Sequence, residues 1–139
     1  MYKASTTIRV RYSETDQMGI LYYGFYAWYY EIGRVEALRD LGIVYKELEE
    51  EGTLMVVGSL TSKFIRSAHY DEELTVVTSV TDIPKMGVVP FATEIYNPQE
   101  DLIHKGTVQI ICVDATTRKR KAVPTEIIEK LSPYFDELD

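Results

Sequence analysis

One long helical pattern among strand-like segments constrains the fold of this 139-residue chain more than any other feature. From Tyr22 to Leu41, apolar and small residues recur at three- and four-residue spacing, and Gly42 then supplies a helix stop. The first half of the segment, Phe25–Tyr30, is apolar on nearly every side, and such a helix is expected to be buried. The sequence therefore predicts one long helix packed inside the protein.

The segments around this helix have the patterns of β-strands. Ala4–Tyr12 alternates with period two, which predicts a strand that buries one face, including Val10 and Tyr12. Short connections favour antiparallel neighbours, since a parallel crossover needs about a dozen residues. We therefore predict an α+β fold over residues 1–139, a single domain in which one antiparallel sheet wraps around one helix. Four further segments are rich in β-branched residues and predict its other strands: Leu54–Ile65, Leu74–Ile83, Val88–Tyr96 and Leu102–Asp114.

Three local features refine this architecture. The charged segment Lys46–Glu51 predicts a short helical turn on the surface, and Thr125 to about Tyr134 predicts a helix near the C-terminus. Pro90 lies inside a predicted strand and lacks the N–H that a ladder needs, so we expect a bulge or an edge position there. A sheet covered on one face leaves its other face wet or available to a second subunit.

Composition narrows the class of protein. The formal net charge of −7 argues against a general nucleic-acid binder, because affinity for phosphate backbones comes mainly from clustered Lys and Arg. The single cysteine, Cys112, excludes an intramolecular disulfide framework, and its apolar surroundings predict a buried side chain rather than a nucleophile. No apolar run approaches the roughly 20 residues that span a bilayer, and the N-terminus lacks a signal-peptide core. We expect a cytoplasmic protein.

Most familiar catalytic motifs are missing from the sequence. It has no Gly-rich phosphate loop, no G-x-S-x-G elbow and no H-E-x-x-H helix. His69 and His104 have no carboxylate or cysteine at metal-ligand spacing, so we expect both to be ordinary surface or strand residues. We expect no metal or redox cofactor.

Asp16 is the strongest candidate for a catalytic group. It lies in a polar loop before Gly19 and the start of the apolar helix. One interpretation is structural, because an aspartate here can cap a turn or the helix N-terminus. The other is functional, because a carboxylate beside unpaired N–H groups at a helix start can act on a carbonyl whose developing oxyanion those groups stabilise. The loop alone leaves both open.

The sequence around Asp16 resembles a known family. The run Arg11–Tyr26, continuing to Glu31–Arg34, is similar to the signature of the hotdog-fold acyl-CoA thioesterases, most closely the 4-hydroxybenzoyl-CoA thioesterase group and its Tol–Pal-associated relatives. The T-D-x-x-G-I/V-x-Y element within that run is fairly specific. Phe64–Glu72, Cys112–Asp114 and Arg120–Pro124 resemble later segments of the same family, so the likeness covers most of the chain in the right order.

The resemblance implies a hotdog fold, a curved antiparallel sheet around one central helix, in homodimers or homotetramers whose active sites lie at the dimer interface. It implies hydrolysis of an acyl-CoA to a free acid and coenzyme A, with no cofactor beyond the coenzyme A of the substrate. Asp16 matches the catalytic aspartate, which attacks the carbonyl or activates a water. Tyr23 matches the residue whose backbone N–H polarises that carbonyl, and Gly19 and Tyr22 of the same motif are expected to contact the substrate.

Other positions match substrate-binding positions of the family, but some of them also have a purely structural interpretation. Glu31 corresponds to a helix position that lines the acyl pocket in some relatives, although it can equally be a surface partner for Arg34 one turn on. Arg66 is a candidate for coenzyme A phosphates. Four basic residues, here called the basic turn, correspond to the region that holds these phosphates in relatives, a solvated charged turn being the alternative: Arg118, Lys119, Arg120 and Lys121.

Two departures and two competing functions remain. Ser67 replaces a proline of many relatives, and Tyr23 replaces a histidine of one branch, although a backbone donor survives that change.

A hydratase or dehydratase of acyl thioesters commonly needs a histidine near the helix start, and none lies between Met1 and Ala68. A non-catalytic module that binds an acyl group or an acyl-carrier protein is the other alternative, although the acidic charge disfavours an acidic carrier. The sequence does not identify the acyl group.

Overall fold

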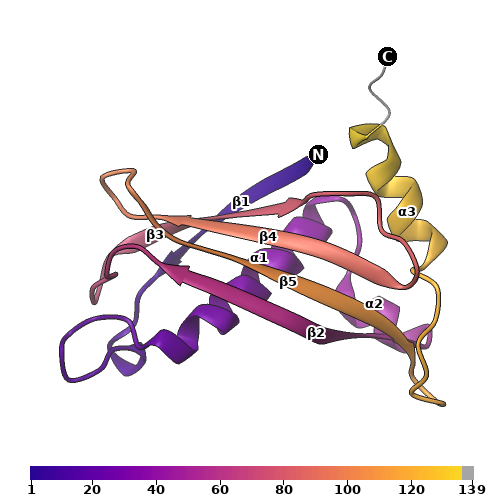
Figure 1. Ribbon diagram of the computed structural model, residues 1–139, viewed down its shortest axis with the longest axis horizontal. Helices are drawn as coiled ribbons and strands as arrows, with labels where there is room; N and C mark the ends of the chain where they lie inside the picture. Colours follow the sequence, from indigo (N-terminus) through magenta and orange to yellow (C-terminus); the bar gives the residue numbers. More distant parts are fainter. Residues whose placement is uncertain (136–139) are drawn as a thin grey trace.

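The computed structural model describes residues 1–135 and shows one antiparallel sheet with a long helix across it (Figure 1). The strands lie in the order β1-β3-β4-β5-β2, and every pair is antiparallel. Short 3-10 turns at Tyr12–Glu14, Tyr23–Phe25 and Ser132–Tyr134 supplement the main elements. These elements are β1 (Tyr2–Arg9), α1 (Tyr26–Asp40), α2 (Tyr45–Glu50), β2 (Thr53–Phe64), β3 (Glu73–Val80), β4 (Val88–Tyr96), β5 (Leu102–Asp114) and α3 (Thr125–Leu131).

The core lies between α1 and one face of the sheet. Tyr29 and Tyr30 on α1 are fully buried against it. Gly33 permits the close approach, because a Cβ there would overlap Thr78 Oγ1 and lie 3.0 Å from Val76 Cγ1 on β3. This arrangement confirms the predicted hotdog architecture, with one long helix packed on a curved antiparallel sheet (Figure 1). No helix within residues 1–135 is long and apolar enough to cross a membrane.

The first strand is shorter than predicted. β1 ends at Arg9 and the chain then enters a 3-10 turn, so the expected burial of Tyr12 is wrong: its side chain is 78% exposed. The turn forms because the Glu14 carboxylate accepts the Arg11 N–H at 3.0 Å, a local bond that competes with strand pairing. The alternating sequence pattern continues to Tyr12, but the bond between the Arg11 N–H and the Glu14 side chain ends the strand at Arg9.

The apolar first half of the long helix is not buried on all sides. Tyr26, Tyr29 and Tyr30 face the sheet and are buried, whereas the Trp28 side chain is 62% exposed. A helix that packs on one face of a sheet buries only one side, so the prediction of burial all round is wrong for a single chain. The predictions for the short helix α2, for α3 and for a buried Cys112 are confirmed.

Pro90 occupies neither a bulge nor an edge strand. β4 lies between β3 and β5, and its register opposite Gln109 is regular. The carbonyl of Pro90 accepts the Thr81 N–H at 3.4 Å, just beyond the last paired residue of β3, Val80. In an antiparallel pair the N–H and C=O of one residue point toward the same neighbouring strand. The N–H that Pro90 lacks would therefore point toward the chain beyond the end of β3, where it would not belong to the ladder.

The two edge strands differ in character. On β2, Val57, Leu60 and Phe64 pair with core residues of β5 and therefore lie on the helix-facing side, yet all three side chains are exposed, Val57 by 53%. The exposed positions of β1 are instead polar or charged, as at Lys3 and Thr7. An exposed apolar edge strand is a place where another chain can pair with the sheet. Of the two edges, β2 has this character and β1 does not.

Candidate active site

Asp16 lies at the tip of a small hairpin, residues 14–22, here called the Asp16 loop. Its N–H donates to the Ile20 carbonyl at 2.9 Å, and the Gly19 N–H donates to the Asp16 carbonyl at 2.9 Å. Gly19 closes the turn with a φ of 77°, which few other residues adopt readily. Asp16 Oδ1 accepts the Met18 N–H at 2.8 Å. The structural interpretation is thus correct for the turn and wrong for the helix, which has no side-chain cap.

The start of the helix presents free backbone donors. Tyr22 precedes the 3-10 turn Tyr23–Phe25, which continues directly into α1. Among the hydrogen bonds of residues 1–135, none uses the Tyr23 or Gly24 N–H as donor. These two groups, with the positive end of the helix dipole behind them, form a place where a carbonyl oxygen can gain negative charge.

A cavity of about 280 Å³ joins the Asp16 loop, the helix start and the end of β2. It brings together three of the residues predicted from sequence: Asp16, Tyr23 and Arg66. The rest of the lining is largely apolar or aromatic, which suits an acyl group beside a reacting carbonyl. The full lining is Asp16, Ile20, Leu21, Tyr23, Tyr26, Phe64, Ile65, Arg66 and Ser67.

An aromatic cluster backs this cavity. Tyr26 packs edge-on against Phe64, with ring centroids 5.2 Å apart, and both rings contact the imidazole of His104 on β5. His104 Nε2 is hydrogen-bonded to the Tyr30 hydroxyl. Burial lowers the pKa of His104 to about 4, so the ring is neutral at physiological pH. His104 is therefore a strand residue, as expected, but it supports the cavity wall, which nothing in its local sequence indicated.

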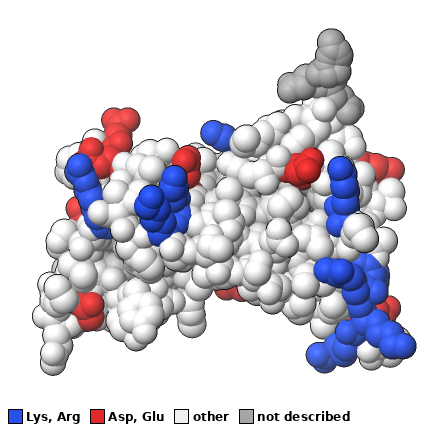
Figure 2. Space-filling view, in the orientation of Figure 1, with Lys and Arg blue, Asp and Glu red and all other residues white. Residues whose placement is uncertain are grey.

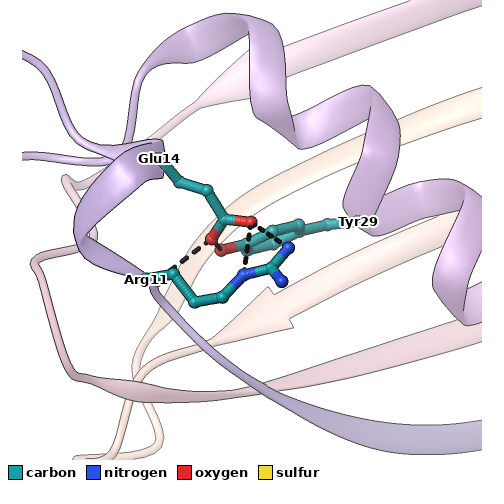
Figure 3. A network of polar contacts seen from close by, with 3 residues as sticks. All are labelled: Arg11, Glu14 and Tyr29. Atoms are coloured by element: carbon teal, nitrogen blue, oxygen red, sulfur yellow. Dashed lines mark hydrogen bonds and ion pairs between the residues drawn. The ribbon is translucent and has the colours of Figure 1, made fainter.

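The first residue of the Asp16 loop carries a buried carboxylate (Figure 3). Glu14 is only 3% exposed and accepts hydrogen bonds from Tyr29 and Arg11. Burial alone would raise the pKa of Glu14, but the bonds from the Tyr29 hydroxyl and from the backbone and guanidinium of Arg11 outweigh it, so the pKa lies below its usual range. Glu14 is not among the site residues predicted from sequence, and its three-residue spacing from Arg11 is the only local signal.

Three predicted site residues on the helix and loop lie outside the cavity lining. Gly19 and Tyr22 flank the cavity within the Asp16 loop. Glu31 is exposed on α1 and does not line the cavity either. Arg34 is buried, which lowers the pKa of its guanidinium, and Tyr45 and Glu31 oppose that shift through their charge, although Glu31 forms no ion pair with Arg34 among residues 1–135. The roles of Glu31, Gly19 and Tyr22 toward substrate stay predictions.

The basic turn lies at the other end of the sheet from Asp16 (Figure 1). Arg120 and Lys121 line a separate cavity of about 560 Å³, and Lys121 Nζ donates to Thr53 Oγ1, at the start of β2, at 3.0 Å. Figure 2 shows basic side chains gathered at the end of the molecule where Figure 1 places this turn. Within one chain the basic turn therefore adjoins the start of β2, whereas the Asp16 cavity adjoins its end.

Comparison with known proteins assigns the family. The family model described as the thioesterase-like superfamily matches residues 10–131. The chain belongs to this superfamily. YneP of Bacillus subtilis (strain 168) is 38% identical to this thioesterase over 128 residues, covering 89% of this chain and 92% of YneP. YbgC of Escherichia coli O6:H1, named an acyl-CoA thioester hydrolase, is 31% identical over 121 residues, covering 87% and 90% of the two chains.

Solved structures agree with this assignment. A Staphylococcus aureus protein described as a DHNA-CoA thioesterase superposes on this thioesterase with a TM-score of 0.88 and 26% identity, covering 99% of this chain and 98% of the other. The resemblance drawn from the sequence is confirmed at the level of family and fold, and so is the prediction of a thioester hydrolase. Within residues 1–135, this thioesterase has no cluster of three His, Cys, Asp or Glu side chains suited to a metal ion.

Proposed function

We propose that this thioesterase hydrolyses an acyl-CoA to a free carboxylic acid and coenzyme A, with Asp16 as the catalytic carboxylate. The observation that supports this most is the single cavity shared by Asp16 and the unpaired Tyr23 N–H at the start of the helix. The names of YbgC and of the Staphylococcus aureus enzyme point to the same class of substrate.

The reaction needs few groups. Asp16 Oδ1 accepts the Met18 N–H, and we assign the reaction to the other carboxylate oxygen, Oδ2. It removes a proton from water as the water oxygen bonds to the thioester carbon, or it attacks that carbon itself and water then cleaves the resulting anhydride. On either route the Tyr23 N–H receives the carbonyl oxygen as it becomes an oxyanion, the carbon–sulfur bond breaks, and the thiolate leaves to take up a proton.

Substituting Asp16 tests the assignment. We expect Asp16→Asn to lower kcat by at least about a thousandfold on any acyl-CoA that the wild type hydrolyses. Asp82→Asn is the matched control, because Asp82 is also a loop aspartate that accepts a backbone N–H, from Ile83 at 2.8 Å, and it lies outside the cavity. Equal turnover by Asp16→Asn and wild type would refute the catalytic role. Wild-type binding of acyl-CoA without turnover, across short, long and aromatic acyl groups, would instead favour the binding module.

The active unit that we propose is a homodimer formed through β2. This edge strand exposes apolar side chains on its helix-facing side, where a second copy would cover them. Two β2 strands related by a two-fold axis run antiparallel, so the start of one strand lies beside the end of the other. That pairing brings the basic turn of one copy, next to Thr53, toward the Asp16 cavity of the other, next to Phe64. The coenzyme A phosphates would then meet the basic turn of the second copy, with Arg66 nearby.

A further inference from the structure

We propose that Glu14 is a positioning residue that fixes the Asp16 loop against the start of the helix, and thereby sets the distance between the Asp16 carboxylate and the Tyr23 N–H. This proposal rests on the proposed function, because it assumes that those two groups act on one carbonyl. Glu14 itself does not line the cavity, so it acts through the groups that do.

The backbone of Glu14 joins the two reacting segments. Its carbonyl accepts the Tyr22 N–H at 2.9 Å. Along the chain, Asp16 is two residues after Glu14, and Tyr23 is the residue after Tyr22. This one hydrogen bond therefore connects the segment that bears the Asp16 carboxylate to the segment that bears the Tyr23 N–H. A change of the hairpin register at Glu14 would move the carboxylate relative to that N–H.

The side chain of Glu14 ties the same point to α1 (Figure 3). Glu14 Oε1 accepts the Tyr29 hydroxyl at 2.6 Å and the Arg11 N–H at 3.0 Å. Glu14 Oε2 accepts Arg11 Nε at 3.1 Å and Arg11 Nη2 at 2.7 Å. Tyr29 is fully buried and lies on α1. Figure 3 shows the Glu14 carboxylate directed toward both the phenol of Tyr29 and the guanidinium of Arg11.

Burial makes this arrangement stiff. A carboxylate out of water needs its hydrogen bonds, because leaving one unmade costs more than an exposed bond is worth. Bonds to an ionised acceptor are also shorter and more directional than neutral ones. The four bonds to Glu14 approach from two segments, the Arg11 backbone and side chain on one side and the helix phenol on the other. The loop that bears Asp16 is therefore held at a defined place relative to the helix axis.

Two substitutions remove this support without touching the cavity. Glu14→Gln keeps the shape of the side chain but removes its charge, and Tyr29→Phe removes only the phenol oxygen. We expect each to lower kcat about 10- to 100-fold, because a displacement of about 1 Å between catalytic groups costs rates of this order. We expect KM to change less than about threefold, since neither residue lines the substrate cavity.

Tyr2→Phe is the matched control. The Tyr2 side chain is 2% exposed, and its hydroxyl also donates to a carboxylate, Asp40 Oδ2 at 2.8 Å, which lies at the far end of α1 from Tyr23. It should lower the melting temperature about as much as Tyr29→Phe and leave kcat unchanged. The double variant Glu14→Gln/Tyr29→Phe should lose little more activity than the worse single variant, because both weaken the same contact between the loop and the helix.

The outcomes separate this proposal from the one on which it rests. A kcat for Tyr29→Phe that matches the kcat for Tyr2→Phe, while Asp16→Asn is inactive, would overturn the positioning role and leave the catalytic assignment intact. Should Glu14→Gln fail to fold, the pair of tyrosine variants still decides the question. A rise in KM with kcat unchanged would also overturn it, because a positioning residue acts on the reaction step. An active Asp16→Asn enzyme would overturn the proposed function itself.

Discussion

The phenol ring of Tyr26 stacks on the imidazole of His104, with ring centroids 4.0 Å apart and planes inclined by 17°. Tyr26 lines the Asp16 cavity, whereas His104 is fully buried behind it on β5. The stack therefore connects a titratable side chain in the core to the wall of the cavity. Protonation of His104 would place a charge in the core, out of water, which costs free energy. Acid should therefore destabilise the fold at the residue that supports the cavity wall.

We predict that His104 destabilises the folded protein as pH falls from 6.5 toward 4. Its pKa is about 4 in the fold against an ordinary value of 6.5, so in this interval the unfolded chain binds more protons and stability decreases with falling pH. The loss due to this one residue reaches about 3 kcal/mol at the acid end. Denaturant unfolding of wild type and His104→Phe over this range, at one protein concentration, measures it. Parallel stability curves for the two proteins would contradict the prediction.

Gly33 should not tolerate a larger residue. Alanine favours a helix over glycine by about 1 kcal/mol, but a Cβ at this position would overlap Thr78 Oγ1 on β3. We expect Gly33→Ala to lower the free energy of unfolding by about 1–3 kcal/mol, as overpacking usually does. The same substitution in a Thr78→Ala background should cost clearly less, because the nearest atom is gone. An equal cost in both backgrounds would show that the contact with Thr78 is not the cause.

The exposed edge of β2 should hold the dimer together. We expect Val57→Lys to halve the mass of the particle measured by sedimentation, because it places a charge on the apolar helix-facing side of the strand. Thr7→Lys, on the polar edge β1, is the control and should leave the mass unchanged. A wild type that sediments as a monomer, or a Val57→Lys protein with the wild-type mass, would refute the proposed interface.

The basic turn should recognise the nucleotide part of the substrate. We expect Arg118→Glu/Lys119→Glu to raise KM about tenfold or more for acyl-CoA, as the loss of hydrogen bonds to a charged group implies. KM should not change for the same acyl group on pantetheine, which lacks the nucleotide, and kcat should not change for either. Lys3→Glu/Arg39→Glu makes the same change in charge away from both cavities. An equal KM increase for that control would mean that only net charge matters.

Mixing two variants tests whether each site uses two chains. A heterodimer of Asp16→Asn with Arg118→Glu/Lys119→Glu has one intact site if the basic turn of one copy serves the Asp16 of the other. Low-KM activity should therefore reappear at about a quarter of the wild-type level when equal amounts of the two variants are unfolded together and refolded, because half of the dimers are then mixed and each mixed dimer has one intact site of two. If a single chain supplies both parts, every site in the mixture is defective and no such activity returns.

Local patterns predicted the elements with few errors, and the errors have a common cause. The bounds of β4 and β5 match the β-branched runs, and α1 and α2 follow within a few residues from helical spacing and glycine stops. β1 ended three residues early because the Glu14 side chain captured the Arg11 N–H. Pro90 was placed wrongly because its effect depends on where the neighbouring strand ends. In each case the deciding partner was a side chain or a strand end that local pattern does not specify.

The sequence by itself determined the family, the strand and helix pattern, and Asp16 as the leading candidate, because these depend on residue types at short spacing. Only the tertiary structure decided what surrounds Asp16. The cavity joins it to Tyr23, Phe64 and Arg66, and Glu14 bonds to Tyr29 across fifteen positions. The tertiary structure also places the basic turn and the Asp16 loop at opposite ends of β2 within one chain. Hydrogen bonds and packing act over a few ångströms of space, and the sheet register, not the order of residues, sets which side chains come that close.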